Sequence, residues 1–193
     1  MFRSTLSHRD APEIKIHFLT YKNQLIHATR SARSRIWIST YVINANLNYQ
    51  SDPITLLFSI LRRRMENGVD VKIICDDPKH NRPNYHCNKF IFRWLEQWQI
   101  PYCTPGPKIT AHAKTVLIDT SHLFIGSHNL AKSSLNNPIE CTVEIKAPSI
   151  IAEYATAYET IWNDVGMIRH MPPFRDEPGA PRPWMEHGYG KSD

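Results

Sequence analysis

The residue types that could do chemistry are concentrated between positions 112 and 140. His112 and Lys114 lie two residues apart in an alternating apolar segment, and side chains two apart in a strand share one face of the sheet. Asp119 has the opposite parity, so we expect it to support the pair or to cap a turn. The sequence therefore predicts that an imidazole and an ammonium group project together.

Two alternating apolar runs flank a polar Asp-Thr-Ser-His turn, and this pattern predicts a β-hairpin. A two-residue turn at Thr120-Ser121 would set Lys114 opposite Ser127 and His112 opposite Asn129. Thr-Ser is not a favoured pair for such a turn, and a shift of one residue would scatter these side chains. In the two-residue register, four polar side chains converge on one patch.

This patch suits a phosphate group better than a metal ion. It lacks the clustered carboxylates that Mg²⁺ prefers, so we expect no metal and no other cofactor. Lys114 and Asn129 can neutralise and hydrogen-bond the non-bridging oxygens while neutral His112 attacks phosphorus in line. Glu140 can orient His112, and Ser127 either supports the site or satisfies a strand end. The candidate catalytic residues are His112, Lys114, Asn129, Glu140, Asp119 and Ser127.

The pattern H-x-K-x-x-x-x-D at positions 112–119, followed by Gly-Ser-x-Asn and Glu140, resembles the motif of the phospholipase D superfamily. The resemblance runs from roughly Gln24 to Trp162, and within the superfamily this sequence is similar to small bacterial single-motif nucleases. It implies that the motif histidine forms a covalent phosphohistidine and that a second motif histidine protonates the leaving oxygen. Water would then release the product. It also implies an α-β-α sandwich.

The resemblance implies two motifs for each site, whereas this sequence contains one. A homodimer with two-fold symmetry would bring His112 and Lys114 of two chains together, and the two histidines would take opposite protonation roles. A single chain could supply both groups if His128, His122 or a loop histidine served as the acid. Strand alternation turns His128 away from His112, so we interpret His128 as structural and favour the dimer.

The elements around the motif predict one α/β domain. We expect helices at 21–34, from Pro53 to Gly68 and before Pro101, and strands at 35–43 and 69–77. The hairpin, a strand at 140–147 and a helix at about 149–163 follow. This order predicts a mixed β-sheet flanked by helices, with parallel neighbouring strands in the first half and one motif per chain. We interpret the Trp94 and Trp98 stripe as core.

A polar segment at 76–89 follows a predicted strand, at a place where open α/β sheets commonly bind ligands. It is either a phosphate-binding rim or an ordinary solvated loop. Tyr85 could stack on a base. A zinc site from His80, His86 and Cys87 lacks a paired C-x-x-C, so we do not predict one. The candidate nucleic-acid-binding residues are Lys79, His80, Arg82 and Lys89, together with Lys132 after the motif.

Composition limits the class of protein. The 193 residues, 41% of them hydrophobic, suffice for one core. We expect an extension at 1–20, a catalytic domain at 21–170 and a tail rich in Pro and Gly at 171–193. No apolar run reaches transmembrane length, and the sequence shows no secretory signal. With four widely spaced cysteines read as reduced thiols, we expect a cytoplasmic protein without integral membrane association.

The formal charge of +5 favours a polyanionic partner. The sequence therefore predicts an endonuclease that hydrolyses DNA or RNA phosphodiesters without a metal. We expect little sequence readout, because phosphate contacts carry no base information. One alternative is a phospholipase acting on an anionic lipid, which should show an apolar rim or anchor beside its site; Phe174 and Trp184 in the tail are weak candidates. The other alternative is a non-catalytic nucleic-acid-binding module.

Overall fold

The structure is a computed structural model that describes residues 12–45, 51–77, 85–164 and 166–170. The helices are α1 (Tyr21–Ser31), α2 (Pro53–Glu66), α3 (Tyr85–Gln97), α4 (Lys132–Leu135) and α5 (Pro148–Asn163). The strands are β1 (Glu13–His17), β2 (Arg35–Thr40), β3 (Ile43–Asn44), β4 (Asp70–Cys75), β5 (Tyr102–Pro105), β6 (Thr115–Ile118), β7 (His122–Gly126), β8 (Leu130–Ala131), β9 (Thr142–Lys146) and β10 (Met167–His170).

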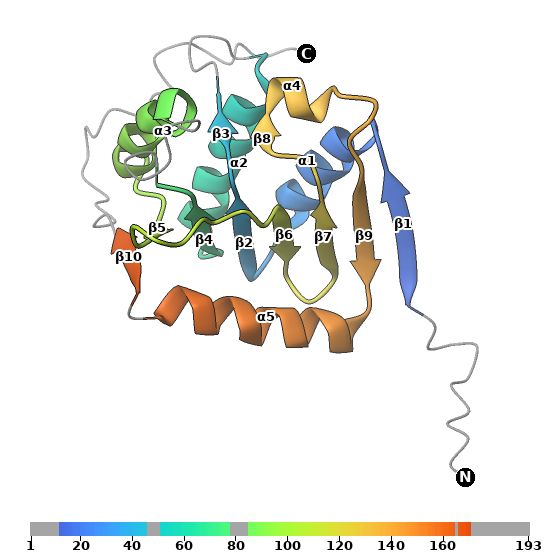
Figure 1. Cartoon of the computed structure of the whole chain (residues 1–193). Helices are drawn as coiled ribbons and strands as arrows, with labels where there is room; N and C mark the ends of the chain where they lie inside the picture. Colours follow the sequence, from blue (N-terminus) through green and yellow to red (C-terminus); the bar gives the residue numbers. More distant parts are fainter. Residues whose placement is uncertain (1–11, 46–50, 78–84, 165, 171–193) are drawn as a thin grey trace.

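Eight strands form one mixed sheet in the order β1-β9-β7-β6-β2-β4-β5-β10, and β3 pairs with β8 in a separate short ladder (Figure 1). β2 and β4 are parallel neighbours, as the alternation of helix and strand predicted. β5, which the sequence analysis missed, pairs parallel with β4. The hairpin β6-β7 joins them through an antiparallel pairing of β6 with β2. The predicted fold class, a mixed β-sheet flanked by helices, is confirmed.

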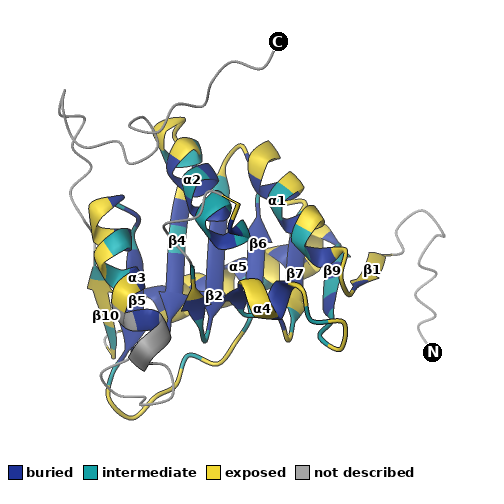
Figure 2. Ribbon diagram, turned by 90° about the horizontal axis from the view of Figure 1, so that it is seen from above, coloured by how far each residue is buried: buried dark blue, intermediate teal, exposed yellow. Residues whose placement is uncertain are grey.

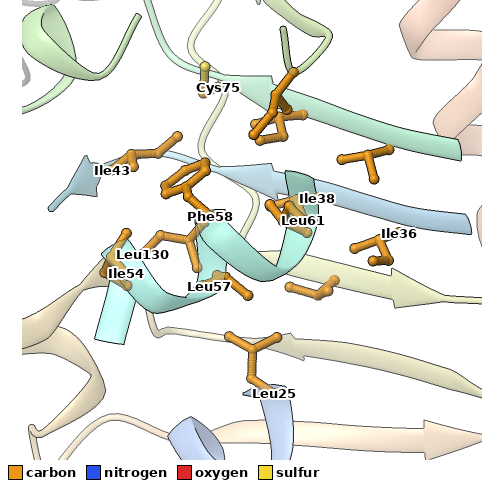
Figure 3. Packing of buried hydrophobic residues seen from close by; sticks show 14 of the residues in the cluster. Leu25, Ile36, Ile38, Ile43, Ile54, Leu57, Phe58, Leu61, Cys75 and Leu130 are labelled. Carbon is orange, nitrogen blue, oxygen red and sulfur yellow. The ribbon is translucent and has the colours of Figure 1, made fainter. Parts of the chain in front are cut away.

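Two hydrophobic cores lie on the two faces of the sheet. Neighbouring residues of β2 serve both, since Ile36 and Ile38 face α1, α2 and α3, whereas Trp37 faces α5. Figure 1 shows α5 running across the strand direction, apart from the other long helices. Burial is concentrated in the central strands and in the helix faces turned toward them (Figure 2). Figure 3 shows Leu25 and Phe58 packed over the first face. The central strands are therefore a rigid support for the segments at their ends.

Local signals explain the ends of α2. The side chain of Asp52 accepts hydrogen bonds from the backbone N–H groups of Ile54 (2.9 Å) and Thr55 (3.2 Å), and Pro53 occupies the first turn, where its missing N–H costs nothing. Gly68 follows the helix with a φ of 80°, in the left-handed region that glycine adopts without strain. The helix predicted between Pro53 and Gly68 is confirmed.

Part of the segment predicted as an N-terminal extension belongs to the sheet. Residues 13–17 form β1, which pairs antiparallel with β9 at the edge. Ile14 and Ile16 are 55% and 64% exposed, so β1 buries little apolar surface and its sequence does not stand out as a core strand. The edge strand β10, paired with β5, was missed as well. The predicted tail at 171–193 lies outside the described residues.

The predicted two-residue hairpin register is wrong by one residue. Ile118 pairs with His122, so three residues form the loop, and the backbone N–H of Gly126 donates to the carbonyl of Lys114 at 3.1 Å. Asp119 has a φ of 53°, a left-handed conformation that Asp tolerates and that three-residue hairpin loops commonly contain. Because β6 begins at Thr115, strand alternation does not set the direction of the motif side chains before it.

Candidate active site

The two central motif residues, His112 and Lys114, both lie against the ring of Tyr41. The ring of Tyr41, just after β2, lies edge-on to the imidazole of His112 with 4.7 Å between centroids. Lys114 Nζ lies 5.1 Å from the centroid of the same ring and donates to the carbonyl oxygen of His112 at 2.8 Å. The imidazole of His112 is exposed and has no hydrogen-bond partner within the described part of the chain. It is therefore open to a ligand.

The surroundings of Lys114 shift the pKa of its ammonium group. Burial lowers the pKa of Lys114, and the carboxylate of Glu140 opposes that shift. A partly desolvated ammonium group interacts more strongly with an anion than a fully hydrated one. The pair can thus receive a phosphate, because the imidazole of His112 is exposed and the ammonium group of Lys114 lies against the same ring.

Asn129 is held by the same loop that carries Tyr41. Its side-chain oxygen accepts from the backbone N–H of Val42 at 3.2 Å, and its amide N–H groups have no partner among the described residues, so they can donate to a ligand. Its backbone N–H donates to Ser134 Oγ at 2.8 Å, and that hydroxyl donates to Glu140 Oε2 at 2.7 Å. The structure therefore links Asn129 and Glu140 through Ser134.

Glu140 does not bind His112 in this chain. Its carboxylate accepts from Ser134 and, at 3.3 Å, from Asn137 Nδ2, and no hydrogen bond joins it to His112 among the described residues. Its connection to Asn129 through the hydroxyl of Ser134 places it beside the site. Glu140 thus orders the loop after Asn129, and its contacts among the described residues do not include His112, which it was expected to orient.

Asp119 supports the framework at the other end of β6 from the site. Its carboxylate accepts from the backbone N–H groups of Arg33 (3.0 Å), Ser34 (2.7 Å) and Arg35 (3.0 Å), and from Ser34 Oγ (2.8 Å). Burial alone would raise the pKa of Asp119, but these hydrogen bonds, with Arg35 and Ser34 foremost, hold it below its usual value. The aspartate of the motif therefore fixes the turn between α1 and β2.

Ser127 joins two strands. Its hydroxyl accepts from the backbone N–H of Cys141 at 3.1 Å and lies 3.3 Å from the carbonyl of the same residue. The neighbouring Gly126 is required because a Cβ there would overlap the carbonyl oxygen of Cys141 and the residue Thr142. The Gly-Ser pair of the motif thus allows the end of β7 to approach the start of β9.

Two buried residues that the sequence analysis did not single out hold the site segments. Asp76, after β4, accepts from the backbone N–H of Ala111 at 3.1 Å, next to His112. Asn88 on α3 is fully buried; it donates to the carbonyls of Tyr41 and Asp76 at 3.0 Å each and accepts from the N–H of Ile43 at 2.9 Å. Acidic residues closing a buried strand were the available signal for Asp76.

The other histidines near the motif in sequence are engaged elsewhere. His128 is buried, its Nδ1 lies 2.8 Å from Thr142 Oγ1, and burial lowers its pKa. Nδ1 of His122 lies 2.7 Å from Glu144 Oε1, at the turn end of the hairpin. Neither imidazole is among the described ring or hydrogen-bond contacts of His112.

An apolar cavity of about 560 Å³ lies beside His112, which is one of its lining residues. It opens between the segment before β6 and the end of α5. Most of its wall is aliphatic, contributed by Ile74, Pro105, Ile109, Ala111, Ile161 and Met167. A ligand at His112 can therefore place an apolar group next to the reacting centre.

The predicted nucleic-acid-binding residues are only partly described. Lys79, His80 and Arg82 lie outside the described residues, and the side chain of Lys89 is not described although its backbone is in α3. Lys132 is exposed at the start of α4. Within the described ranges, no group of three or more His, Cys, Asp or Glu side chains is placed to hold a metal ion. No described helix is long and apolar enough to cross a membrane.

Comparisons with known proteins place this geometry in context. A family model described as "Cardiolipin synthase, PLD-like domain" matches residues 25–162. Phospholipase D Y of Dictyostelium discoideum is 23% identical over 108 residues, which are 55% of this chain and 25% of that protein. The chain thus spans about a quarter of this relative.

Solved structures share the fold. Nuc from Salmonella typhimurium, a phospholipase D family member, superposes with a TM-score of 0.65 at 19% identity, covering 82% of this chain and 98% of that one. NucT from Helicobacter pylori gives 0.62 at 20% identity, with 82% and 99% covered. Phosphatidylserine synthase from Haemophilus influenzae gives 0.66 at 14% identity, with 89% of this chain and 43% of that one covered.

Proposed function

The chain belongs to the phospholipase D superfamily, and on that premise we propose that it hydrolyses nucleic-acid phosphodiester bonds without a metal ion, in a site completed by a second copy of the chain. The observation that carries the proposal is the exposed imidazole of His112, which has no hydrogen-bond partner among the described residues, with the ammonium group of Lys114 beside it and both against Tyr41. This donor set suits phosphoryl chemistry, since it offers a nucleophile and a cation.

The reaction has two balanced steps. Neutral His112 attacks phosphorus, the bond from phosphorus to the leaving oxygen breaks, and a protonated histidine gives its proton to that oxygen. That histidine, now neutral, takes a proton from water, whose oxygen attacks the phosphohistidine and releases the phosphate product and His112. Lys114 and the free amide N–H groups of Asn129 stabilise the charge on the non-bridging oxygens in both steps.

The second histidine is assigned to a partner copy. Within the described part of the chain, His128 is buried against Thr142 and His122 is bound to Glu144, so neither is positioned to protonate a leaving group at His112. A two-fold dimer supplies the missing group as His112 of the partner. Protonation states then differ between the two copies, one imidazole acting as nucleophile and the other as acid.

Nucleic acid is the preferred substrate. The formal charge of +5 favours a polyanion, and phosphate contacts dominate the affinity of proteins for nucleic acid. The shared fold covers nearly the whole of Nuc and NucT but less than half of phosphatidylserine synthase, which supports a one-motif unit of the former kind.

A specific observation favours a second candidate, hydrolysis or transfer at an anionic phospholipid. The aliphatic cavity beside His112 could accept part of an acyl chain, and Ile109 on its rim is 61% exposed. An apolar wall at a phosphodiester site stabilises a lipid more than a hydrophilic strand.

One experiment separates the two substrates. Wild-type protein and His112→Ala are incubated in excess EDTA with labelled single- and double-stranded DNA and RNA, and in parallel with anionic phospholipid vesicles. The proposal expects strand cleavage by the wild type, none by the variant, and no lipid turnover. Lipid turnover that depends on His112, without strand cleavage, would replace the nuclease by the phospholipid enzyme.

A further inference from the structure

A second hollow, of about 430 Å³, lies between α1, α2 and α4. α1 contributes Lys22, His27 and Arg30 to its lining, and α4 contributes Lys132 and Asn136. No carboxylate is among its lining residues, all of which belong to the described part of the chain. We call this hollow the helical groove. Its charged lining is entirely cationic.

The cations of the helical groove are available to a ligand. Lys22 Nζ donates to the neutral side chain of Asn136 at 3.0 Å, so its charge is not balanced. Arg30 and Lys132 are exposed, and none of the three cations forms an ion pair among the described residues. Lys22 and Arg30 are eight residues apart on one face of α1, which corresponds to about 12 Å. Lys22 and Arg30 therefore place two positive charges along the length of the helical groove.

The helical groove adjoins another hollow, of about 480 Å³, which shares Lys132 and Asn136 with it and extends from α4 toward β3. Asn44 of β3 also lines this adjoining hollow, and β3 pairs with β8 directly after Asn129. The carboxylate in its wall, Asp52, is buried and already caps the N-terminus of α2. A strand leaving the site can thus pass α4 and enter the helical groove.

We propose that the helical groove binds the backbone phosphates of the same nucleic-acid strand whose scissile phosphate lies at His112. This inference rests on the proposed function and extends it, because it assigns the strand a path beyond the reacting bond. Rows of lysine and arginine without acidic neighbours bind phosphates by releasing counterions. Such contacts position a strand without reading its sequence.

The test measures binding in a His112→Ala background, which prevents turnover. Lys22→Gln with Arg30→Gln removes two cations of the helical groove, and Arg63→Gln with Arg93→Gln removes two exposed cations of α2 and α3 that do not line it. Affinity for a long single-stranded oligonucleotide and for a trinucleotide is measured by fluorescence anisotropy across a salt series. Thermal unfolding checks that every variant is folded.

The proposal expects the groove pair to lower affinity for the long strand roughly tenfold and the slope of log K against log salt by about 1.4, since each phosphate contact on a single strand contributes about 0.7. The trinucleotide is too short to reach from His112 into the groove, so the groove pair should lower its affinity less than that of the long strand. The control variant with Arg63→Gln and Arg93→Gln should bind both oligonucleotides with an affinity and a salt slope close to those of the His112→Ala parent.

Equal losses in both pairs, or no loss in the groove pair, would overturn the inference, as would groove-dependent binding of anionic vesicles without binding of the strand. Failure of the proposed function has a different signature. In that case wild-type protein leaves the strand uncut although its binding still depends on Lys22 and Arg30.

Discussion

At the scale of single residues, the proposed mechanism requires the cation of Lys114 next to His112, the proposed nucleophile. Lys114 is fixed by the carbonyl of His112 and by the ring of Tyr41. In the proposed reaction, its ammonium group stabilises the negative charge that develops on the phosphate during attack. The contribution of Lys114 should therefore appear in the chemical step more than in binding.

Lys114→Ala should lower kcat on the cleaved substrate by about 10²- to 10³-fold, the usual effect of removing one donor that stabilises the transition state. Lys15→Ala is the matched control, because Lys15 is a lysine of the edge strand β1 paired with Glu13. Single-turnover cleavage at saturating enzyme measures the chemical step. An equal effect of the two substitutions would show that Lys114 acts only through overall charge.

Asp76 is a positioning residue, since it touches the backbone next to His112. Asp76→Ala leaves the N–H of Ala111 without this acceptor, and the displaced segment should lower kcat roughly 100-fold with little change in KM. Asp76→Asn keeps a carbonyl acceptor and should restore most of the rate. Rates are compared on protein shown to be folded by circular dichroism. Failure of the asparagine variant to recover any activity would contradict the positioning role.

At the scale of elements, Asp119 joins the hairpin to the turn between α1 and β2. Its folded-state pKa is lowered, so its stabilising effect is fully present above the unfolded-state pKa and is lost as pH falls through the folded-state value. Asp119→Asn should thus reduce the free energy of unfolding at neutral pH by about 2 kcal/mol, because hydrogen bonds to a charged group are weakened. Urea titrations at neutral and acidic pH measure this.

The difference between wild type and Asp119→Asn should shrink as pH falls below about 3.9, the ordinary value for an aspartate in an unfolded chain. A difference that stays constant over the whole acidic range would mean that the charge of Asp119 does not stabilise the fold. Glu144→Gln should show the same dependence on acidic pH. Burial would raise the pKa of Glu144, but hydrogen bonds from His17 and His122 lower it.

Elements with strong local signals were predictable, and those defined by distant partners were not. Helix α2 carries its own cap and stop in Asp52 and Gly68. The hairpin was predicted too, but its register depends on hydrogen bonds between Asp119 and a turn more than 80 positions earlier, as with Arg35. β1 was missed because its isoleucines are exposed.

The candidate site shows the same division. The spacing of His112, Lys114 and Asn129 was visible in the sequence, since a motif is a local pattern. The supports were not, because Asn88 reaches Tyr41 across 47 positions and Asp76 reaches Ala111 across 35. Such contacts depend on how the ends of β2 and β4 meet, which local patterns do not fix.

At the scale of the whole molecule, the account requires two chains for each site. If wild type and His112→Ala exchange subunits freely, only pairs of two wild-type chains hold both histidines. Activity should then fall with the square of the wild-type fraction, measured after co-refolding mixtures at fixed total concentration. A linear dependence would show that one chain acts alone, whereas Lys15→Ala mixed with wild type should leave activity per chain unchanged.

Detection of a covalent phosphohistidine would establish the proposed mechanism. Wild-type protein is mixed with the intact substrate strand, and the reaction is quenched under denaturing alkaline conditions. The protein is then digested, and mass spectrometry locates any added phosphoryl group. We expect an acid-labile adduct on His112 that forms and decays within the turnover time and is absent from His112→Ala. Turnover without an adduct on His112, or an adduct that survives in the variant, would contradict it.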